Sequence, residues 1–186
     1  MRLFLAINLA PELRRAIVDA TAPLRAAAPT LSWVDDSRLH LTLKFLGDQP
    51  DTAVAPLRAT MDDVVERHRS FAMRLTGIGA FPNFRRARVV WMGVEHEPRL
   101  ELLHHDIELA CERHGFELEG RPFRPHLTLA RVKDRTEVDE LRALSRAGKR
   151  VEFEEDAVVD SLDLMQSHLG AGAHYECLHA APLRRR

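Results

Sequence analysis

The 186-residue chain carries 27 Lys and Arg against 28 Asp and Glu, which gives a formal net charge of −1. It has no overall positive field to attract nucleic acid, so any such contact needs a local basic patch. No stretch approaches the roughly 20 apolar residues that a membrane-spanning helix needs.

The N-terminal segment and the cysteines point to a location inside the cell. Residues 1–7 are apolar but too short for a signal peptide, and are predicted as a first strand. Cys111 and Cys177 have no Cys-x-x-Cys spacing and are expected as small buried side chains in a reducing compartment. We therefore expect a soluble cytoplasmic protein, with residues 1–186 forming one two-lobed domain.

The apolar pattern predicts strands and helices that alternate along the chain. Segments with alternating or continuous short apolar runs are predicted as strands: 2–8, 31–35, 40–46, 71–78, 88–95, 126–132, 150–165 and 174–181. Segments with apolar residues at helical spacing are predicted as helices: about 11–28, 52–68, 98–114 and 137–147, the last capped by Thr136. Turns are expected at 81–84 and 170–172. The recurrence of strand and helix in each half indicates an internal duplication, with the halves packed face to face around a cleft.

One short motif occurs twice. Residues 40–45 read His-Leu-Thr-Leu-Lys-Phe, and residues 126–131 read His-Leu-Thr-Leu-Ala-Arg, a little under half the chain apart. On a strand, alternate side chains share a face, so the His and Thr of each copy stand on one face about 6.6 Å apart. The leucines then face the core.

The same alternation places the residues that follow each motif. Lys44 falls on the face of His40, and Phe45 falls on the leucine face. Arg131 also falls on the leucine face, so it reaches the histidines only from beyond the strand end or through a twist or bulge.

Two histidines in matched settings suit acid–base catalysis without a metal. The Gly-x-Ser-x-Gly, Walker A and dinucleotide-binding glycine motifs are absent, and neither copy has a His-Glu-x-x-His pattern or a nearby cysteine ligand for zinc. Phosphoryl transfer to water fits better, since one imidazole can take a proton from water while the other protonates the leaving oxygen. A strained cyclic phosphodiester is a suitable substrate for such a site.

Five stretches carry a family resemblance, in order along nearly the whole chain: 1–9, 39–48, 81–94, 123–132 and 167–178. With them the sequence resembles the 2H (two-histidine) phosphoesterase superfamily, and within it the RNA 2′,3′-cyclic phosphodiesterases, also called LigT-like 2′–5′ RNA ligases. The resemblance implies an α+β fold. Two pseudo-symmetric lobes, each an antiparallel sheet backed by helices, would surround a central cleft.

The resemblance also implies roles for the motif residues. His40 would be the general acid and His126 the general base. Thr42, Thr128 and Arg131 would contact the phosphate. The implied reaction opens a terminal 2′,3′-cyclic phosphate to a 2′-phosphate, with no metal or cofactor. His168 departs from the pattern, because an arginine often follows the serine in that last stretch.

Several alternatives stay open. The same residues could catalyse the reverse reaction, which joins RNA ends through a 2′–5′ bond. The chain could instead bind RNA ends or nucleotides without turnover. A third alternative is an esterase that acts on small cyclic nucleotides or ADP-ribose cyclic phosphate. The expected partners are RNA ends or nucleotides that carry a 2′,3′-cyclic phosphate. We expect no membrane, no obligate protein partner and a monomer.

Some further residues have an ordinary structural interpretation. His104 and Glu108 lie one helical turn apart and are expected on a solvated face, a metal site being the less favoured interpretation. Trp91 is expected in the core or the cleft wall. Phe84 stands beside a basic pair at 85–86 and could stack a base, although a structural role is favoured.

Overall fold

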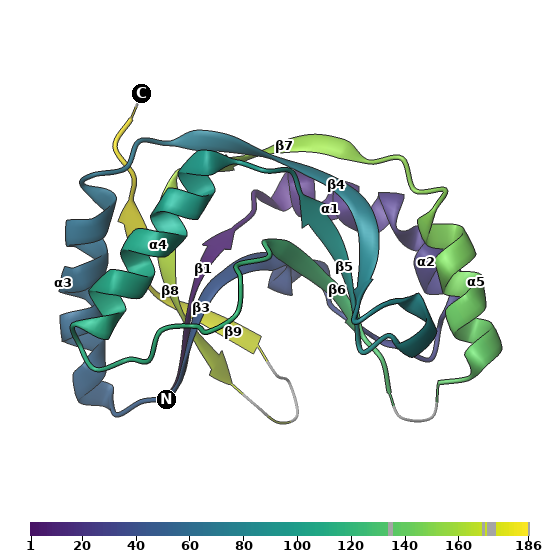
Figure 1. Cartoon of the computed structure of the whole chain (residues 1–186), viewed down its shortest axis with the longest axis horizontal. Helices are drawn as coiled ribbons and strands as arrows, with labels where there is room; N and C mark the ends of the chain where they lie inside the picture. Colours follow the sequence, from purple (N-terminus) through teal and green to yellow (C-terminus); the bar gives the residue numbers. More distant parts are fainter. Residues whose placement is uncertain (134–135, 169, 171–173, 186) are drawn as a thin grey trace.

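The computed structural model describes residues 1–133, 136–168, 170 and 174–185. Within these residues the strands form one antiparallel sheet that runs through both lobes of the molecule (Figure 1). The strands are β1 (Arg2–Asn8), β2 (Ser32–Trp33), β3 (His40–Asp48), β4 (Phe71–Phe81), β5 (Val89–Val94), β6 (His126–Arg131), β7 (Glu154–Val159), β8 (Ser161–His168) and β9 (His174–Pro182). Their order is β7-β4-β5-β6-β3-β1-β8-β9, and β2 pairs with β6.

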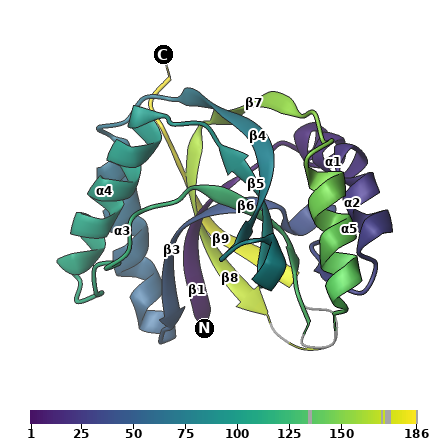
Figure 2. The ribbon, with the colours of Figure 1, turned by 45° about the vertical axis from the view of Figure 1, so that its right-hand side comes forward.

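The helices lie in two groups, one on each lobe. They are α1 (Pro11–Ala20), α2 (Ala22–Ala27), α3 (Val54–Val65), α4 (Pro98–Glu112) and α5 (Val138–Gly148). In both ribbon views α3 and α4 lie side by side at one end of the molecule, and α1, α2 and α5 lie together at the other end (Figures 1 and 2). The expected α+β fold with two lobes, each a set of antiparallel strands backed by helices, is confirmed.

The lobes are not the two halves of the sequence. The lobe of β3 contains β1 and α3 from the first half and α4, β8 and β9 from the second half. The other lobe combines α1, α2, β4 and β5 with β6, α5 and β7. The prediction that two sequence halves pack face to face is therefore wrong. Strands that neighbour one another in this sheet come from distant parts of the chain, so each lobe needs both halves.

Apolar residues of the sheet and helices form a continuous core between them. Leu41 and Leu127, the first leucines of the two motifs, are both fully buried. Burying a leucine stabilises the fold by about 1.5–3 kcal/mol, so each motif strand is anchored through its leucine face.

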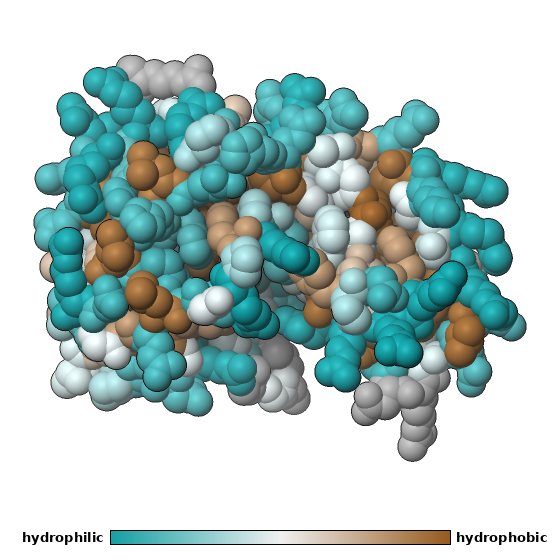
Figure 3. Space-filling model, in the orientation of Figure 1, coloured by the Kyte–Doolittle hydropathy of each residue, from teal (hydrophilic) through white to brown (hydrophobic). Residues whose placement is uncertain are grey.

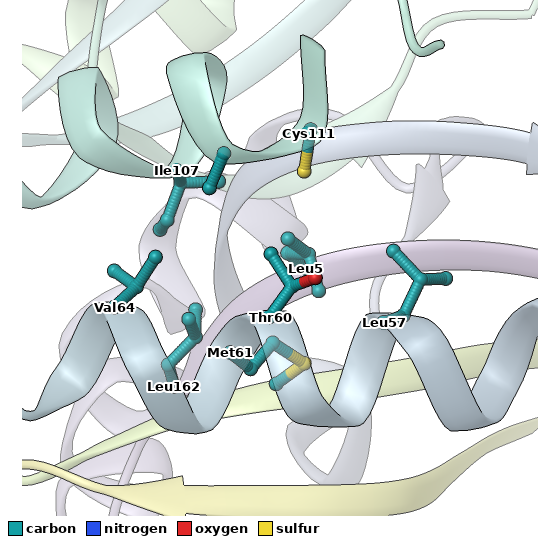
Figure 4. Close-up of a pocket in the computed structure, with 9 residues that line it drawn as sticks. Leu5, Leu57, Thr60, Met61, Val64, Ile107, Cys111 and Leu162 are labelled. Carbon is teal, nitrogen blue, oxygen red and sulfur yellow. The ribbon is translucent and has the colours of Figure 1, made fainter. Parts of the chain in front are cut away.

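A small apolar pocket lies within this core between α3, α4 and the sheet (Figure 4). Its lining residues are Leu5, Leu57, Thr60, Met61, Val64, Ile107, Ala110, Cys111 and Leu162. It lacks the convergent polar groups that orient a ligand, so it is an imperfection in core packing and not a binding site.

Several expected elements differ in detail. The helix predicted over 11–28 divides at the buried Thr21, whose hydroxyl donates to the Ile17 carbonyl (2.7 Å), and Pro23 then begins a new turn. The strand predicted over 150–165 is two antiparallel strands that belong to different parts of the sheet. The residue that precedes α5 is Glu137, so the predicted Thr136 cap is wrong.

Other outcomes concern the surface and the turns. Cys111 is buried as expected, whereas Cys177 is exposed because β9 is an edge strand. The turn predicted at 170–172 falls mostly outside the described residues.

Hydrophobic residues form scattered small areas within a hydrophilic surface on the face shown in Figure 3. Among the helices that the structure describes, none is long and apolar enough to span a membrane.

Candidate active site

The two motif strands meet at their leucines. Leu41 of β3 pairs with Leu127 of β6 in antiparallel orientation. Extending this register by one residue in each direction sets His40 opposite Thr128 and Thr42 opposite His126. The repeat is therefore related by a pseudo-twofold axis at the leucine pair. We call the side of the sheet that carries these four polar residues the open face.

Both motif strands contain a bulge at the same position. In β3, Thr42 pairs with Ala6 while Lys44 pairs with Leu5, which leaves Leu43 as an extra residue. A bulge of this kind resets the alternation of side chains. Lys44 consequently turns into the protein, where its exposed fraction is 7%, and Phe45 turns outward with an exposed fraction of 71%.

This bulge corrects the expectation for β3. Phe45 pairs with Phe4, and the Phe4 ring contacts the ring of His40 at a centroid distance of 5.0 Å. Phe45 therefore shares the open face with His40, and Lys44 does not. The strict period of two fails at this point because the extra residue moves Lys44 and Phe45 each to the opposite face.

The equivalent bulge in β6 brings Arg131 to the open face. Thr128 pairs with Trp91, and Ala130 pairs with Val90, so Leu129 is the extra residue. Arg131 then pairs with Val89, which in turn pairs with Phe81. The Phe81 ring contacts the ring of His126 at 4.9 Å, so this row of residues lies on the same face as His126. Arg131 is exposed there, at the end of its strand.

His40 is held by a backbone carbonyl and by aromatic rings. Its Nδ1 lies 2.8 Å from the Arg38 carbonyl oxygen, and because a carbonyl only accepts, Nδ1 carries the hydrogen. Its Nε2 lies 3.1 Å from the Thr42 hydroxyl. Phe4 and Tyr175 pack on the ring at 5.0 and 5.2 Å. This burial lowers the pKa of His40 below its ordinary value, and the Arg38 carbonyl partly opposes the effect.

His126 has the same arrangement on the other lobe. Its Nδ1 lies 2.7 Å from the Arg124 carbonyl oxygen, again two residues before the histidine. Phe81 packs edge-on against the ring, and the Trp91 centroid lies 6.4 Å away. In both histidines the Nδ1–H is engaged by the backbone, so Nε2 is the nitrogen left to exchange protons with a ligand.

The position of the Trp91 ring depends on Gly79, its partner on the neighbouring strand β4. A Cβ atom placed on Gly79 would lie 2.1 Å from Cζ2 of the indole, so the ring rests directly on the backbone of β4. Trp91 thus forms a wall of the site beside His126, as expected for a core or cleft-wall residue.

The sequence alone did not point to the other residues around His40. Phe4 and Tyr175 come from β1 and β9, and only the strand pairing brings them to the histidine. Asn8 pairs with His40 and donates to the buried Asp163 carboxylate at 2.7 Å. The one available signal was that Phe4 and Tyr175 fall within stretches that carry the family resemblance.

Three further predictions have a structural outcome. Nε2 of His168 lies 2.9 Å from the Glu176 carboxylate, and the His168 ring stacks on the ring of His174; both partners lie on β9, as does Tyr175. Phe84 packs against the core near Gly148 of α5, in line with a structural role. The solvated face expected for the helix is wrong at Glu108, which is 7% exposed and paired with Lys44.

The donor set at the open face consists of imidazoles, hydroxyls and one guanidinium. Over the described ranges, no three His, Cys, Asp or Glu side chains gather as metal ligands would. The arrangement can move protons at two Nε2 atoms and can bind an anion through Thr42, Thr128 and Arg131.

Comparisons with known proteins identify the family of the chain. A model of the 2′-5′ RNA ligase superfamily matches residues 10–171. An RNA 2′,3′-cyclic phosphodiesterase of Geobacillus stearothermophilus is 38% identical over 128 residues, which are 69% of this chain but only 41% of that protein. The protein of the same name from Methanothermobacter thermautotrophicus is 33% identical over 144 residues, 77% of this chain and 78% of the relative.

A solved structure extends the likeness to the whole fold. A crystal structure of a Thermus thermophilus protein matches with a TM-score of 0.81 and 31% identity, and covers 100% of this chain and 99% of that one. The resemblance stated from the motifs is thereby confirmed. The chain belongs to the 2′-5′ RNA ligase superfamily.

Proposed function

We propose that this protein hydrolyses the 2′,3′-cyclic phosphate at the end of an RNA to a 2′-phosphate, by acid–base catalysis with His40 and His126 and without a metal ion. The observation that carries the proposal is the matched state of the two histidines. Each Nδ1–H is bound by a backbone carbonyl, and the two rings are related by a pseudo-twofold axis on one open face. The relatives named RNA 2′,3′-cyclic phosphodiesterase support the substrate class.

The proposed reaction balances with these groups alone. Nε2 of His126 takes a proton from water as the water oxygen bonds to phosphorus. The bond between phosphorus and O3′ breaks, and Nε2–H of His40 donates its proton to O3′. In-line displacement sets the entering and leaving oxygens on opposite sides of phosphorus, which suits an imidazole base and an imidazolium acid related by a pseudo-twofold axis.

The remaining polar residues would hold the phosphate. The hydroxyls of Thr42 and Thr128 stand next to the opposing histidines in the extended register, and Arg131 reaches the same face through its bulge. Hydrogen bonds from such donors strengthen as charge gathers on the phosphoryl oxygens in the transition state.

The acid role of His40 depends on the substrate. Burial lowers its pKa in the free protein, which favours the neutral imidazole. A bound phosphate anion favours the protonated imidazolium, so substrate binding itself would charge the proton donor. The rate kcat/KM would therefore decrease as pH rises and less of His40 is protonated.

The same residues can catalyse the reverse step. A 5′-hydroxyl in place of water would attack the cyclic phosphate and form a 2′–5′ bond, although water is present in great excess. We expect a monomer in the cytoplasm that acts on RNA ends and requires no protein partner.

The test uses a short RNA with a terminal 2′,3′-cyclic phosphate in excess EDTA. Wild-type protein is expected to open it to the 2′-phosphate, and His40→Ala and His126→Ala are each expected to lower the rate about 10²- to 10⁴-fold, or about 3–5 kcal/mol of barrier. Full activity in the double variant would refute the mechanism. Binding without turnover would favour a binding module, and turnover of small cyclic nucleotides only would change the substrate.

A further inference from the structure

A buried ion pair joins the first motif strand to α4. Nζ of Lys44 lies 2.8 Å from each carboxylate oxygen of Glu108 and 2.8 Å from the Glu117 carbonyl oxygen. The backbone N–H of Glu119 donates to the same carboxylate at 2.9 Å. All three donors of the ammonium group are therefore used, and both charged residues are at least nine-tenths buried.

The bulge in β3 places this pair. Because Leu43 is an extra residue, Lys44 turns to α4 and not to the open face. At the equivalent position of the second motif stands Ala130, which is fully buried and carries no charge. The pair therefore belongs to one lobe only.

The pair holds a segment whose backbone has few other attachments, although Phe116 and Phe123 pack against the core. Residues 116–125, which we call the strap, connect α4 to β6 without a helix or strand. Within the described chain, no backbone–backbone hydrogen bond joins residues 117–125 to another segment. Besides Lys44 and Glu108, a second contact from α4 holds the strap: the His104 ring stacks on Phe123 at 3.9 Å with an interplanar angle of 11°.

The strap ends at the carbonyl that orients a motif histidine. The residue after Phe123 is Arg124, and its carbonyl oxygen accepts the Nδ1–H of His126 at 2.7 Å. Lys44 and α4 thus contact the strap at residues 117, 119 and 123, the last of them directly before Arg124.

We infer that Lys44 and Glu108 are positioning residues for His126: they fasten the strap whose Arg124 carbonyl fixes the tautomer and the direction of the His126 ring. The inference rests on the proposed function for its kinetic consequence. The tautomer of His126 can be measured without any substrate.

A double substitution can separate a role of the ion pair in positioning the strap from its contribution to folding stability. A buried ion pair costs desolvation, and replacing both partners by apolar residues of similar volume is often neutral or stabilising, whereas removing one partner is strongly destabilising. The double variant Lys44→Met/Glu108→Leu should therefore keep the fold while releasing the strap at Glu117 and Glu119.

The experiment measures Tm, kcat and KM for this double variant. We expect Tm near the wild-type value, and kcat about 10- to 100-fold lower with KM little changed, because a displacement on the order of 1 Å suffices for such a loss. Asp106→Asn is the control, since it weakens the His68–Asp106 contact on the same helix (3.0 Å) without touching the strap. It should keep kcat. Wild-type kcat in a double variant with wild-type Tm would overturn the inference.

A substitution at the exposed Glu119 makes the same test and leaves both side chains of the ion pair in place. Glu119→Pro removes the N–H that donates to Glu108, while Glu119→Ala keeps it. The proline variant is expected to have the lower kcat by several-fold. Equal values of kcat in the two variants would count against the strap as a positioning element.

The substrate-independent measurement is a ¹H–¹⁵N spectrum of the histidine rings, with His126 assigned from the His126→Gln spectrum. Wild-type His126 is expected in the Nδ1–H tautomer, and the double variant is expected to shift to the Nε2–H tautomer that free histidine favours. An unchanged tautomer would overturn the inference whatever the enzyme does. A shifted tautomer in a protein that turns over no cyclic phosphate would support the strap and reject the proposed function.

Discussion

Gly79 provides a test of how closely the site wall controls His126. A methyl group at this position would lie 2.1, 2.2 and 2.6 Å from three atoms of the Trp91 indole. The indole packs on Phe81 at 5.1 Å, and Phe81 contacts the ring of His126. Gly79→Ala therefore acts on His126, the proposed general base, through two aromatic rings and without changing any polar group.

The size of the effect follows from these distances. Ordinary carbon–carbon contact is about 3.5 Å, so the indole must move by roughly 1.4 Å to accept the methyl group. Overpacking of this kind costs about 1–3 kcal/mol of folding free energy. A displacement of about 1 Å near reacting groups can lower the rate up to 10²-fold, so we expect kcat for the cyclic phosphate to fall about 10- to 100-fold.

The matched control is Gly77→Ala on the same strand. Gly77 has a φ of +72°, and a methyl group added there would meet nothing within 4 Å, so alanine adds backbone strain but does not press on Trp91. That strain costs about 1–2 kcal/mol. Urea unfolding and steady-state kinetics are measured for both variants. If Gly79→Ala and Gly77→Ala lose stability alike and both keep kcat, the aromatic wall does not position His126.

Two further outcomes are expected. Because burial lowers the pKa of His40 below its ordinary value of 6.5, the unfolded chain binds more protons than the native protein as pH falls below that value, so stability is present above it and is lost as pH decreases. Urea midpoints measured across this range should fall less steeply for His40→Gln, and an identical pH dependence would contradict the assignment. Arg131→Met should lower kcat/KM about 10²- to 10³-fold through the loss of a charged donor, with Tm unchanged because the side chain is exposed. A change in kcat/KM below twofold would remove Arg131 from the site.

Much of the secondary structure is readable from the sequence because it depends on near neighbours. The strands of the two motifs and the helix over residues 98–112 are found close to the predicted positions. The long helix predicted over residues 11–28 is two helices that divide at Thr21. The buried Thr21 hydroxyl donates to the Ile17 carbonyl, and Pro23 follows in the next helix. Side-chain burial at that point depends on tertiary packing, which local periodicity does not contain.

The amino-acid sequence by itself shows the repeat and the types of residue at the candidate site. It also predicts that His and Thr share a face within each motif, because side chains two residues apart on a strand point to the same side. Strand pairing then placed Phe45 on the open face and Lys44 in the core. It also brought Arg131 to the histidines, since a bulge appears only when a strand is paired with its neighbours. The aromatic walls and the Lys44–Glu108 pair join segments far apart in the chain, and such contacts are selected by packing and not by local sequence.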